Sequence, residues 1–146
     1  MKAFSQLLDR LTYTPARNGK LMLMRNYFLG TPDPDRGFAL AALTDGLPID
    51  FPLRRVLSEI GESRFDPDLF RMSRDDVGDT AETVALIWPV TETEGEAPRL
   101  SEIVAALSKA GRGGHAALLT QRLDRLDATG RWALLKLVTG GMRVGI

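Results

Sequence analysis

The stretch GRWALLKLVTGGMRVGI, residues 130–146, carries the pattern that best decides the fold. Apolar side chains recur at helical spacing, at Trp132, Leu135 and Val138, and further apolar neighbours widen this stripe. We expect Thr129 to be the N-cap of this helix. The pair Gly140 and Gly141 then ends it, because glycine adopts the left-handed conformation that a helix C-terminus often needs. The stretch therefore predicts an apolar helix that the rest of the chain supports.

Helical spacing of apolar residues continues through almost the whole chain, and no segment has a convincing strand pattern. The sequence predicts an all-α fold, an irregular bundle of about eight or nine short helices forming a single domain over residues 1–146. Before residue 63 we expect four helices, one of which extends over residues 34–44. The buried faces of the other three are formed by Phe4, Leu7, Leu8 and Leu11, by Leu21, Met24 and Phe28, and by Leu53, Val56, Leu57 and Ile60. After residue 63 and before the final helix we expect a short helix over residues 67–75 and three longer ones. The buried faces of these three are formed by Ala81, Val84, Ala85 and Trp88, by Leu100, Ile103, Val104 and Leu107, and by Ala116, Leu119, Leu123 and Leu126.

A polar residue followed by proline recurs at Thr14-Pro15, Asp33-Pro34 and Asp66-Pro67, and each pair reads as the N-cap and first residue of a helix. Asp79 and Glu82 have the spacing of a capping box. Together with Asp75 and Asp76 these carboxylates could also suggest a metal site, but helix ending and capping is the favoured interpretation. No other set of residues has metal-ligand spacing, because the chain has one His and no Cys.

The bulk composition is that of an ordinary globular domain. A chain of 146 residues with 44% hydrophobic and 26% charged residues can bury one core. No apolar run approaches the roughly 20 residues of a membrane span, and the N-terminus does not resemble a signal peptide. The absence of Cys excludes disulfides and suits a reducing compartment. We therefore expect a cytoplasmic protein that does not contact a membrane.

The net charge is zero, but the charges are distributed unevenly along the chain. Residues 1–56 carry 8 Lys and Arg against 5 Asp and Glu, and residues 99–146 carry 8 against 3. Residues 57–98 carry 3 against 11. This asymmetry can place a basic face opposite an acidic one. Random scatter of the charges is the alternative.

Three groups of residues have the chemistry of a phosphate contact. The first is Thr14, Arg17 and Lys20, at the expected start of a helix. Cations are unfavourable there because the helix dipole is positive at its N-terminus, and an external anion would relieve the mismatch. Solvated surface charge is the alternative.

The second group is Arg112, Gly113 and Gly114, where the glycines leave backbone N–H groups open at a helix N-terminus and Arg112 adds a full charge. A simple interhelical turn is the alternative. The neighbouring His115 is better explained as a surface or helix-start residue than as a general base. The third group follows the final helix, where Arg143 lies among Gly140, Gly141 and Gly145 and can reach an anion that comes close to the backbone.

The chain resembles the N-terminal DNA-binding domain of bacterial ATP-dependent DNA ligases, in the group associated with the DNA-damage (cisplatin) response. The segments that carry the likeness are LLDRLTYTPARNGKL, TPDPDRGFALAALT, VGDTAETVALIWP and LDATGRWALLKLVTGGMRVG. The resemblance covers nearly the whole chain. It implies that the three groups contact DNA and that Gly78, in a structural turn, allows a close approach to it. Some relatives carry a second basic residue where Gly141 stands, which would weaken that local contact.

The resemblance implies non-sequence-specific binding of nicked double-stranded DNA in DNA repair, replication or recombination, through contacts to phosphates and the minor groove. Contacts to phosphate and sugar position a protein but carry no sequence code. The chain lacks the lysine motif KxDG on which such ligases attach AMP, and it has no phosphate loop. We therefore expect a non-catalytic fragment that needs no cofactor. The parent ligase would use ATP and a divalent metal such as Mg²⁺, and its catalytic nucleotidyltransferase domain would follow this one.

We expect a monomer near the nucleoid whose partners are nicked DNA and the catalytic domains. A helical protein-interaction scaffold is the alternative function, in which the apolar stripes and the acidic segment bind a partner protein. An enzyme of another type is disfavoured, because no catalytic constellation is recognisable in the sequence.

Overall fold

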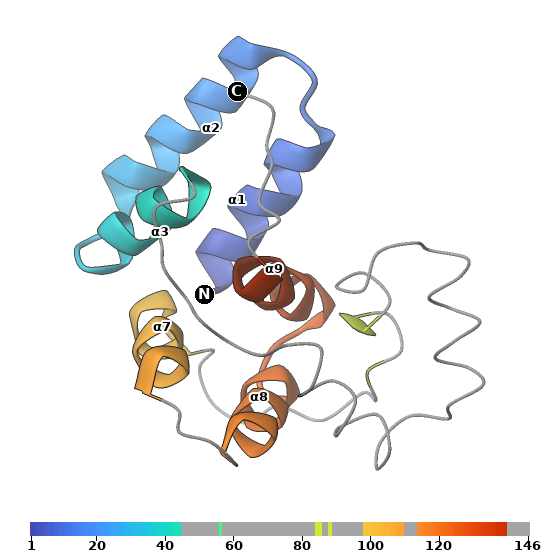
Figure 1. Cartoon of the computed structure of the whole chain (residues 1–146). Coiled ribbons are helices and arrows are strands. Elements are labelled where there is room, and N and C mark those ends of the chain that lie inside the picture. The colour runs from blue at the N-terminus through green and yellow to red at the C-terminus, as the bar shows by residue number, and fades with distance from the viewer. Residues whose placement is uncertain (45–55, 57–83, 86–87, 89–97, 110–113, 140–146) are drawn as a thin grey trace.

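The computed structural model of the chain describes residues 1–44, 56, 84–85, 88, 98–109 and 114–139 (Figure 1). Within these ranges all regular structure is helical, which confirms the predicted all-α class. The helices are α1 (Lys2–Tyr13), α2 (Arg17–Gly30), α3 (Asp35–Leu43), α7 (Leu100–Lys109), α8 (His115–Asp124) and α9 (Ala128–Thr139). These six do not match the predicted number of eight or nine. Most of the expected helix at 52–62, and all of that at 67–75, lie outside the described residues.

Helix α9 occupies the centre of the arrangement, with α1 and α8 packed against it (Figure 1). Its residues Ala133, Leu134 and Leu135 have no exposed surface, and Leu137 and Val138 are also buried. A helix that is apolar nearly all round must be covered on most sides. The first part of the stretch 130–146 thus forms the helix around which the described core is built.

Helix α1 packs on α9 and also on α2. Its four expected core residues, Phe4, Leu7, Leu8 and Leu11, are all buried. Their spacing places them along one stripe of the helix, so one face can be removed from water while the other stays solvated. Full burial of each such side chain contributes about 1.5–3 kcal/mol before the cost of ordering the chain.

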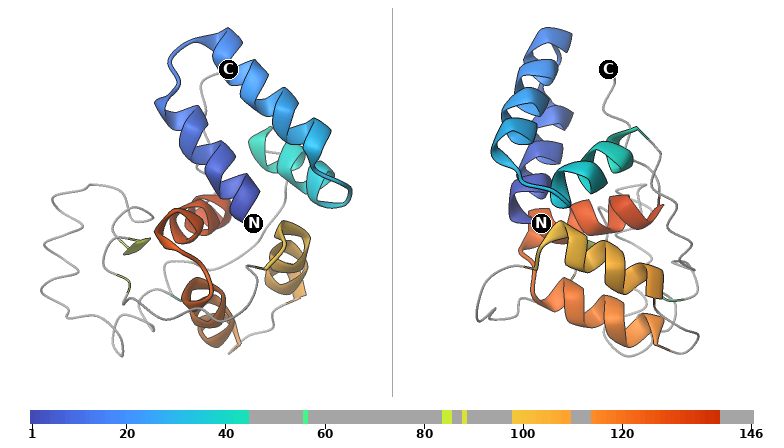
Figure 2. Two further views of the ribbon diagram at one scale, coloured as in Figure 1. Left: turned by 180° about the vertical axis from the view of Figure 1, so that it is seen from behind. Right: turned by 90° about the vertical axis from the view of Figure 1, so that its left-hand side faces the viewer.

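Helix α2 departs from the prediction, because it has no buried residue. Leu21, expected on a buried face, is 42% exposed, and Met24 and Phe28 are only half-buried. The helix lies at the outside of the bundle (Figure 2). It reaches the core through aromatic rings: Tyr27 lies 6.3 Å from Phe4 and 5.5 Å from Phe28 between ring centroids.

Helices α7 and α8 follow the predicted pattern closely. Leu100, Ile103, Val104 and Leu107 of α7 are buried. In α8, Leu119 and Leu123 are buried and Ala116 is half-buried, while Leu126 is buried just after the helix. Val84, Ala85 and Trp88 are buried as expected, whereas Ala81 lies outside the described residues. The core therefore joins side chains from both ends of the chain.

Asp35 ties α3 to the start of α7. Its Oδ1 accepts a hydrogen bond of 3.0 Å from the backbone N–H of Ser101, and its Oδ2 lies 3.8 Å from Nε of Arg99. Burial acts to raise the pKa of Asp35, but the hydrogen bonds from Ser101 and the charge of Arg99 outweigh it and leave the pKa below its ordinary value. A carboxylate from one helix thus caps another.

Three predicted N-caps are wrong. Thr14 is the C-cap of α1, and α2 begins two residues later than expected, with Ala16 as its N-cap. Asp127, not Thr129, caps α9, because its Oδ1 accepts a 2.8 Å hydrogen bond from the N–H of Gly130. In both cases another residue within two positions occupies the cap. The third wrong prediction is Asp33, because the N-cap of α3 is Pro34 and no side-chain hydrogen bond caps that helix.

None of the helices in the described part of the chain has the length and apolarity that crossing a membrane requires.

Candidate nucleic-acid interface

The described residues include four of the predicted DNA contacts, Thr14, Arg17, Lys20 and Gly114. The other seven lie outside the described residues, namely Gly78, Arg112, Gly113, Gly140, Gly141, Arg143 and Gly145.

Thr14, Arg17 and Lys20 come together at the turn between α1 and α2. The hydroxyl of Thr14 donates a 2.7 Å hydrogen bond to the carbonyl of Arg10, and its backbone N–H bonds to Leu11. The turn is tightly folded, because a Cβ built on Gly19 would lie only 3.0 Å from the Thr14 methyl group. The hydroxyl of Thr14 is thus committed to closing α1, although its oxygen can still accept a bond.

The N-terminus of α2 has the features of an anion site. Its N-cap Ala16 offers no side-chain hydrogen bond, and the first turn contains no acidic residue. The helix instead begins with the exposed Arg17, and Lys20 follows on the same face one turn later. The first backbone N–H groups and the positive end of the dipole add to these charges. This end of the helix therefore has the charge and the backbone donors that an anion-binding site requires.

The basic character extends beyond the predicted residues. Residues 10–32 contain four cations, Arg10, Arg17, Lys20 and Arg25, and no Asp or Glu. Arg10 and Arg25 are both exposed, and neither is among the contacts predicted from the sequence. The sequence signal that points to both residues is the absence of Asp and Glu between Asp9 and Asp33. We call the α1–α2 turn together with these four residues the basic hairpin.

Gly114 is the N-cap of α8, and no side chain caps that helix end or places an acidic group in its first turn. The φ of Gly114 is −97°, so its backbone conformation is open to any residue. The start of α8 and the α1–α2 turn lie at opposite ends of the described structure (Figures 1 and 2). The two predicted groups therefore cannot hold a single phosphate, and only an extended ligand could contact both.

Arg131 illustrates a cation that is not available to a ligand. It is 6% exposed, and its Nε donates a 2.8 Å hydrogen bond to the carbonyl of Leu123. Burial lowers the pKa of its guanidinium, and the carboxylates of Asp124 and Asp127 oppose that shift. Asp124 also accepts a 2.9 Å hydrogen bond from the indole of Trp88. Arg131 thus joins α8 to α9 and serves the fold.

The net charge of the whole chain is zero, and its basic excess lies in residues 1–56 and 99–146, which include most of the ranges that the structure describes. Most of the acidic segment 57–98 lies outside them. In the described ranges no group of three or more metal-binding side chains occurs, and Asp75, Asp76, Asp79 and Glu82 are not among these residues.

Comparison of the chain with protein-family models, with curated proteins and with solved structures finds no match. The likeness to ligase DNA-binding domains therefore rests on the motif residues in the sequence.

Proposed function

We propose that this chain binds nicked double-stranded DNA without sequence specificity, as the substrate-holding module of an ATP-dependent DNA ligase. The basic hairpin is the central contact. The observation that carries the proposal is the coincidence of four cations, an uncapped helix N-terminus and a stretch without carboxylates. Such a surface addresses phosphates, which every DNA sequence presents alike.

The remaining predicted contacts extend the same proposal. Gly114 with Arg112 and Gly113 would engage a second part of the duplex, because the start of α8 lies far from the hairpin. Gly78 and the Arg143 segment with its glycines would complete the set. In this proposal the chain is monomeric, cytoplasmic and non-catalytic, and ATP and the divalent metal serve the catalytic domains of the ligase. Incubation with labelled ATP tests this last point, because a lysine–AMP adduct would contradict it.

The alternative is a helical protein-interaction scaffold, and one observation favours it. Tyr13, Met22 and Leu29 of the α1–α2 pair are 80%, 65% and 72% exposed. Large apolar side chains that remain solvated on an outer helix are typical of a surface that meets another protein. An apolar interface responds weakly to salt, whereas phosphate contacts weaken steeply, so the two functions can be separated.

A binding assay with charge-removal variants tests the proposal. Fluorescence anisotropy on a labelled nicked duplex would compare the wild-type chain with the triple variant Arg10→Ala, Arg17→Ala, Arg25→Ala. The control is Lys2→Ala, Lys109→Ala, which removes two exposed cations, one fewer than the triple variant, from elsewhere on the described surface. We expect the triple variant to lose most of the affinity and the control to retain it. Equal binding by the wild-type chain and the triple variant, with the helical content unchanged, would contradict the role of the hairpin.

A further inference from the structure

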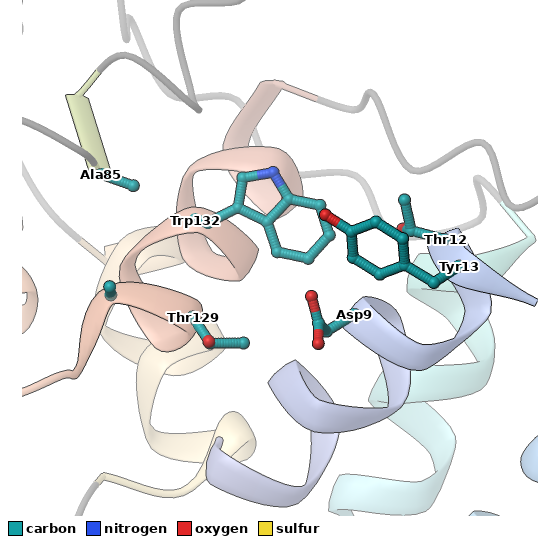
Figure 3. A pocket seen from close by; sticks show the side chains of 7 residues that line it. Asp9, Thr12, Tyr13, Ala85, Thr129 and Trp132 are labelled. Atoms are coloured by element: carbon teal, nitrogen blue, oxygen red, sulfur yellow. The ribbon is translucent and has the colours of Figure 1, made fainter.

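A pocket of about 370 Å³ lies between one face of α1 and the start of α9 (Figure 3). The residues that line it are Asp9, Thr12 and Tyr13 from α1, Ala128, Thr129 and Trp132 from α9, and Ala85. Asp9, Thr12 and Tyr13 share a face because they are spaced at i, i+3 and i+4. The pocket is thus a product of the packing of α1 on α9.

The Asp9 carboxylate has no partner in the described structure. Asp9 is half-buried, and no hydrogen bond or ion pair with another described residue holds its side chain. Figure 3 shows the carboxylate pointing toward the space beneath the rings of Tyr13 and Trp132. The carboxylate oxygens still reach the solvent in the pocket. A cation that entered the pocket would gain a direct electrostatic attraction to them.

The rest of the lining suits the same kind of ligand. The π faces of Tyr13 and Trp132 are electron-rich and attract cations that lie over them. Thr12 donates its hydroxyl proton to the carbonyl of Leu8 at 2.9 Å, so its oxygen presents an acceptor. None of the lining residues is Lys, Arg or His. Asp9 is the one charged residue of this lining, so the pocket favours a cation over a phosphate, although it adjoins the basic hairpin.

The exposed ring of Tyr13 at the rim of the pocket indicates that the cation belongs to a partner protein. Tyr13 is 80% exposed, so an aromatic ring stands in solvent at the edge of the pocket. Exposed aromatic residues beside a small pocket are frequent anchors of protein–protein contacts, where one projecting side chain fills the pocket. The volume is at the lower end of the range for ligand sites and suits a single side chain.

We propose that this pocket receives an arginine or lysine side chain from a partner protein, held by the Asp9 carboxylate between the rings of Tyr13 and Trp132. The guanidinium or ammonium group pairs with Asp9, and the aliphatic stem lies against the two rings. This function is separate from DNA binding and does not depend on it.

The test titrates the ¹⁵N-labelled chain with the peptide acetyl-Gly-Gly-Arg-Gly-Gly-amide and follows the two indole N–H signals, assigned with the variant Trp132→Phe. We expect the Trp132 signal to shift with a dissociation constant of about 1 mM, and the signal of the buried Trp88 to stay in place. The same peptide with neutral citrulline in place of arginine should not bind. Equal shifts with both peptides would overturn the proposal, because the recognition would not then depend on charge.

Variants identify the groups responsible. Asp9→Asn should weaken peptide binding about tenfold or more, whereas Asp33→Asn, which changes an exposed carboxylate outside the pocket, should leave it unchanged. Tyr13→Phe keeps the ring and should retain binding, and Tyr13→Ala should lose much of it. Asp9→Asn preserves the size of the side chain and Tyr13 is exposed, so the circular dichroism spectrum should stay the same. Undiminished binding by Asp9→Asn would overturn the proposal.

Methylguanidinium chloride distinguishes a protein side chain from a small free cation. If methylguanidinium shifts the Trp132 signal and the arginine peptide does not, the pocket takes a small molecule and the partner-protein proposal fails. Binding of the peptide at least as tight as that of methylguanidinium supports it. DNA affinity is measured separately, so failure of this proposal leaves the DNA-binding proposal untouched.

Discussion

Replacing Asp35 by Asn should destabilise the fold by an amount that depends on pH. The carboxylate of Asp35 is 14% exposed, accepts a hydrogen bond from Ser101 and lies 3.8 Å from the Arg99 guanidinium. A hydrogen bond to a charged group contributes about 1.5–3 kcal/mol, of which a neutral amide keeps a part, and the half-solvated ion pair adds less than about 1 kcal/mol. We therefore expect a loss of about 1–2 kcal/mol at pH 7.

The sign of the pH dependence follows from the direction of the shift. The folded state holds the pKa of Asp35 below its ordinary value of 3.8. The stabilisation is therefore fully present once the pH is about one unit above that ordinary value, that is, above about pH 4–5. It is lost as the pH falls through the folded pKa and the carboxylate becomes protonated. The difference between the wild-type chain and Asp35→Asn should then shrink toward zero in acid.

Urea unfolding followed by circular dichroism, at pH 7 and at several values below 4, measures this difference. Asp33→Asn is the matched control, because Asp33 is an exposed carboxylate two residues away. A difference that stays constant from neutral to acid pH would refute the argument from the charge. So would a loss at pH 7 no larger than that of the control.

Three further substitutions test the packing and the caps, each by urea unfolding. Leu134→Ala in the central helix should cost about 2–5 kcal/mol, whereas Leu29→Ala, at a position 72% exposed, should stay within about 0.5 kcal/mol; similar losses would contradict the assignment of the core. Arg131→Met should cost about 1–3 kcal/mol because a buried carbonyl loses its donor, and an unchanged midpoint would show that the bond contributes little. Asp127→Ala should cost about 1 kcal/mol as the loss of an N-cap, while Thr129→Ala should cost less; the reverse order would restore the cap predicted from the sequence.

The elements that the sequence predicts well are those whose apolar stripe is covered by other elements. Phe4, Leu7, Leu8 and Leu11 repeat at helical spacing, and all four are buried. Helix α2 has a comparable apolar content, yet it remains largely solvated. Periodicity records which residues could be buried together, and it does not record whether another element arrives to cover them.

Caps and long-range polar contacts are harder to predict. Thr129 and Asp127 are both suitable N-caps two residues apart, and only the chain direction at the helix entrance decides between them. The bond from Ser101 to Asp35 joins residues 66 positions apart, and no local pattern announces it. The basic hairpin is predictable in part, from Arg17 and Lys20. The stretch without carboxylates between Asp9 and Asp33 also points to Arg10 and Arg25, but only the structure shows that the two helices meet at one turn.

The salt dependence of DNA binding tests the central claim most directly. If the four cations of the basic hairpin each contact a phosphate, they contribute about −3.6 to the slope of the logarithm of the affinity against the logarithm of salt, and the other proposed contacts make the slope steeper. Raising salt from about 50 to about 200 mM would then weaken binding to nicked duplex by at least about 150-fold, and removal of three arginines should make the slope shallower by about 2.7. A slope near zero, or binding to DNA that is absent even at the lower salt concentration, would contradict the account and favour a protein partner.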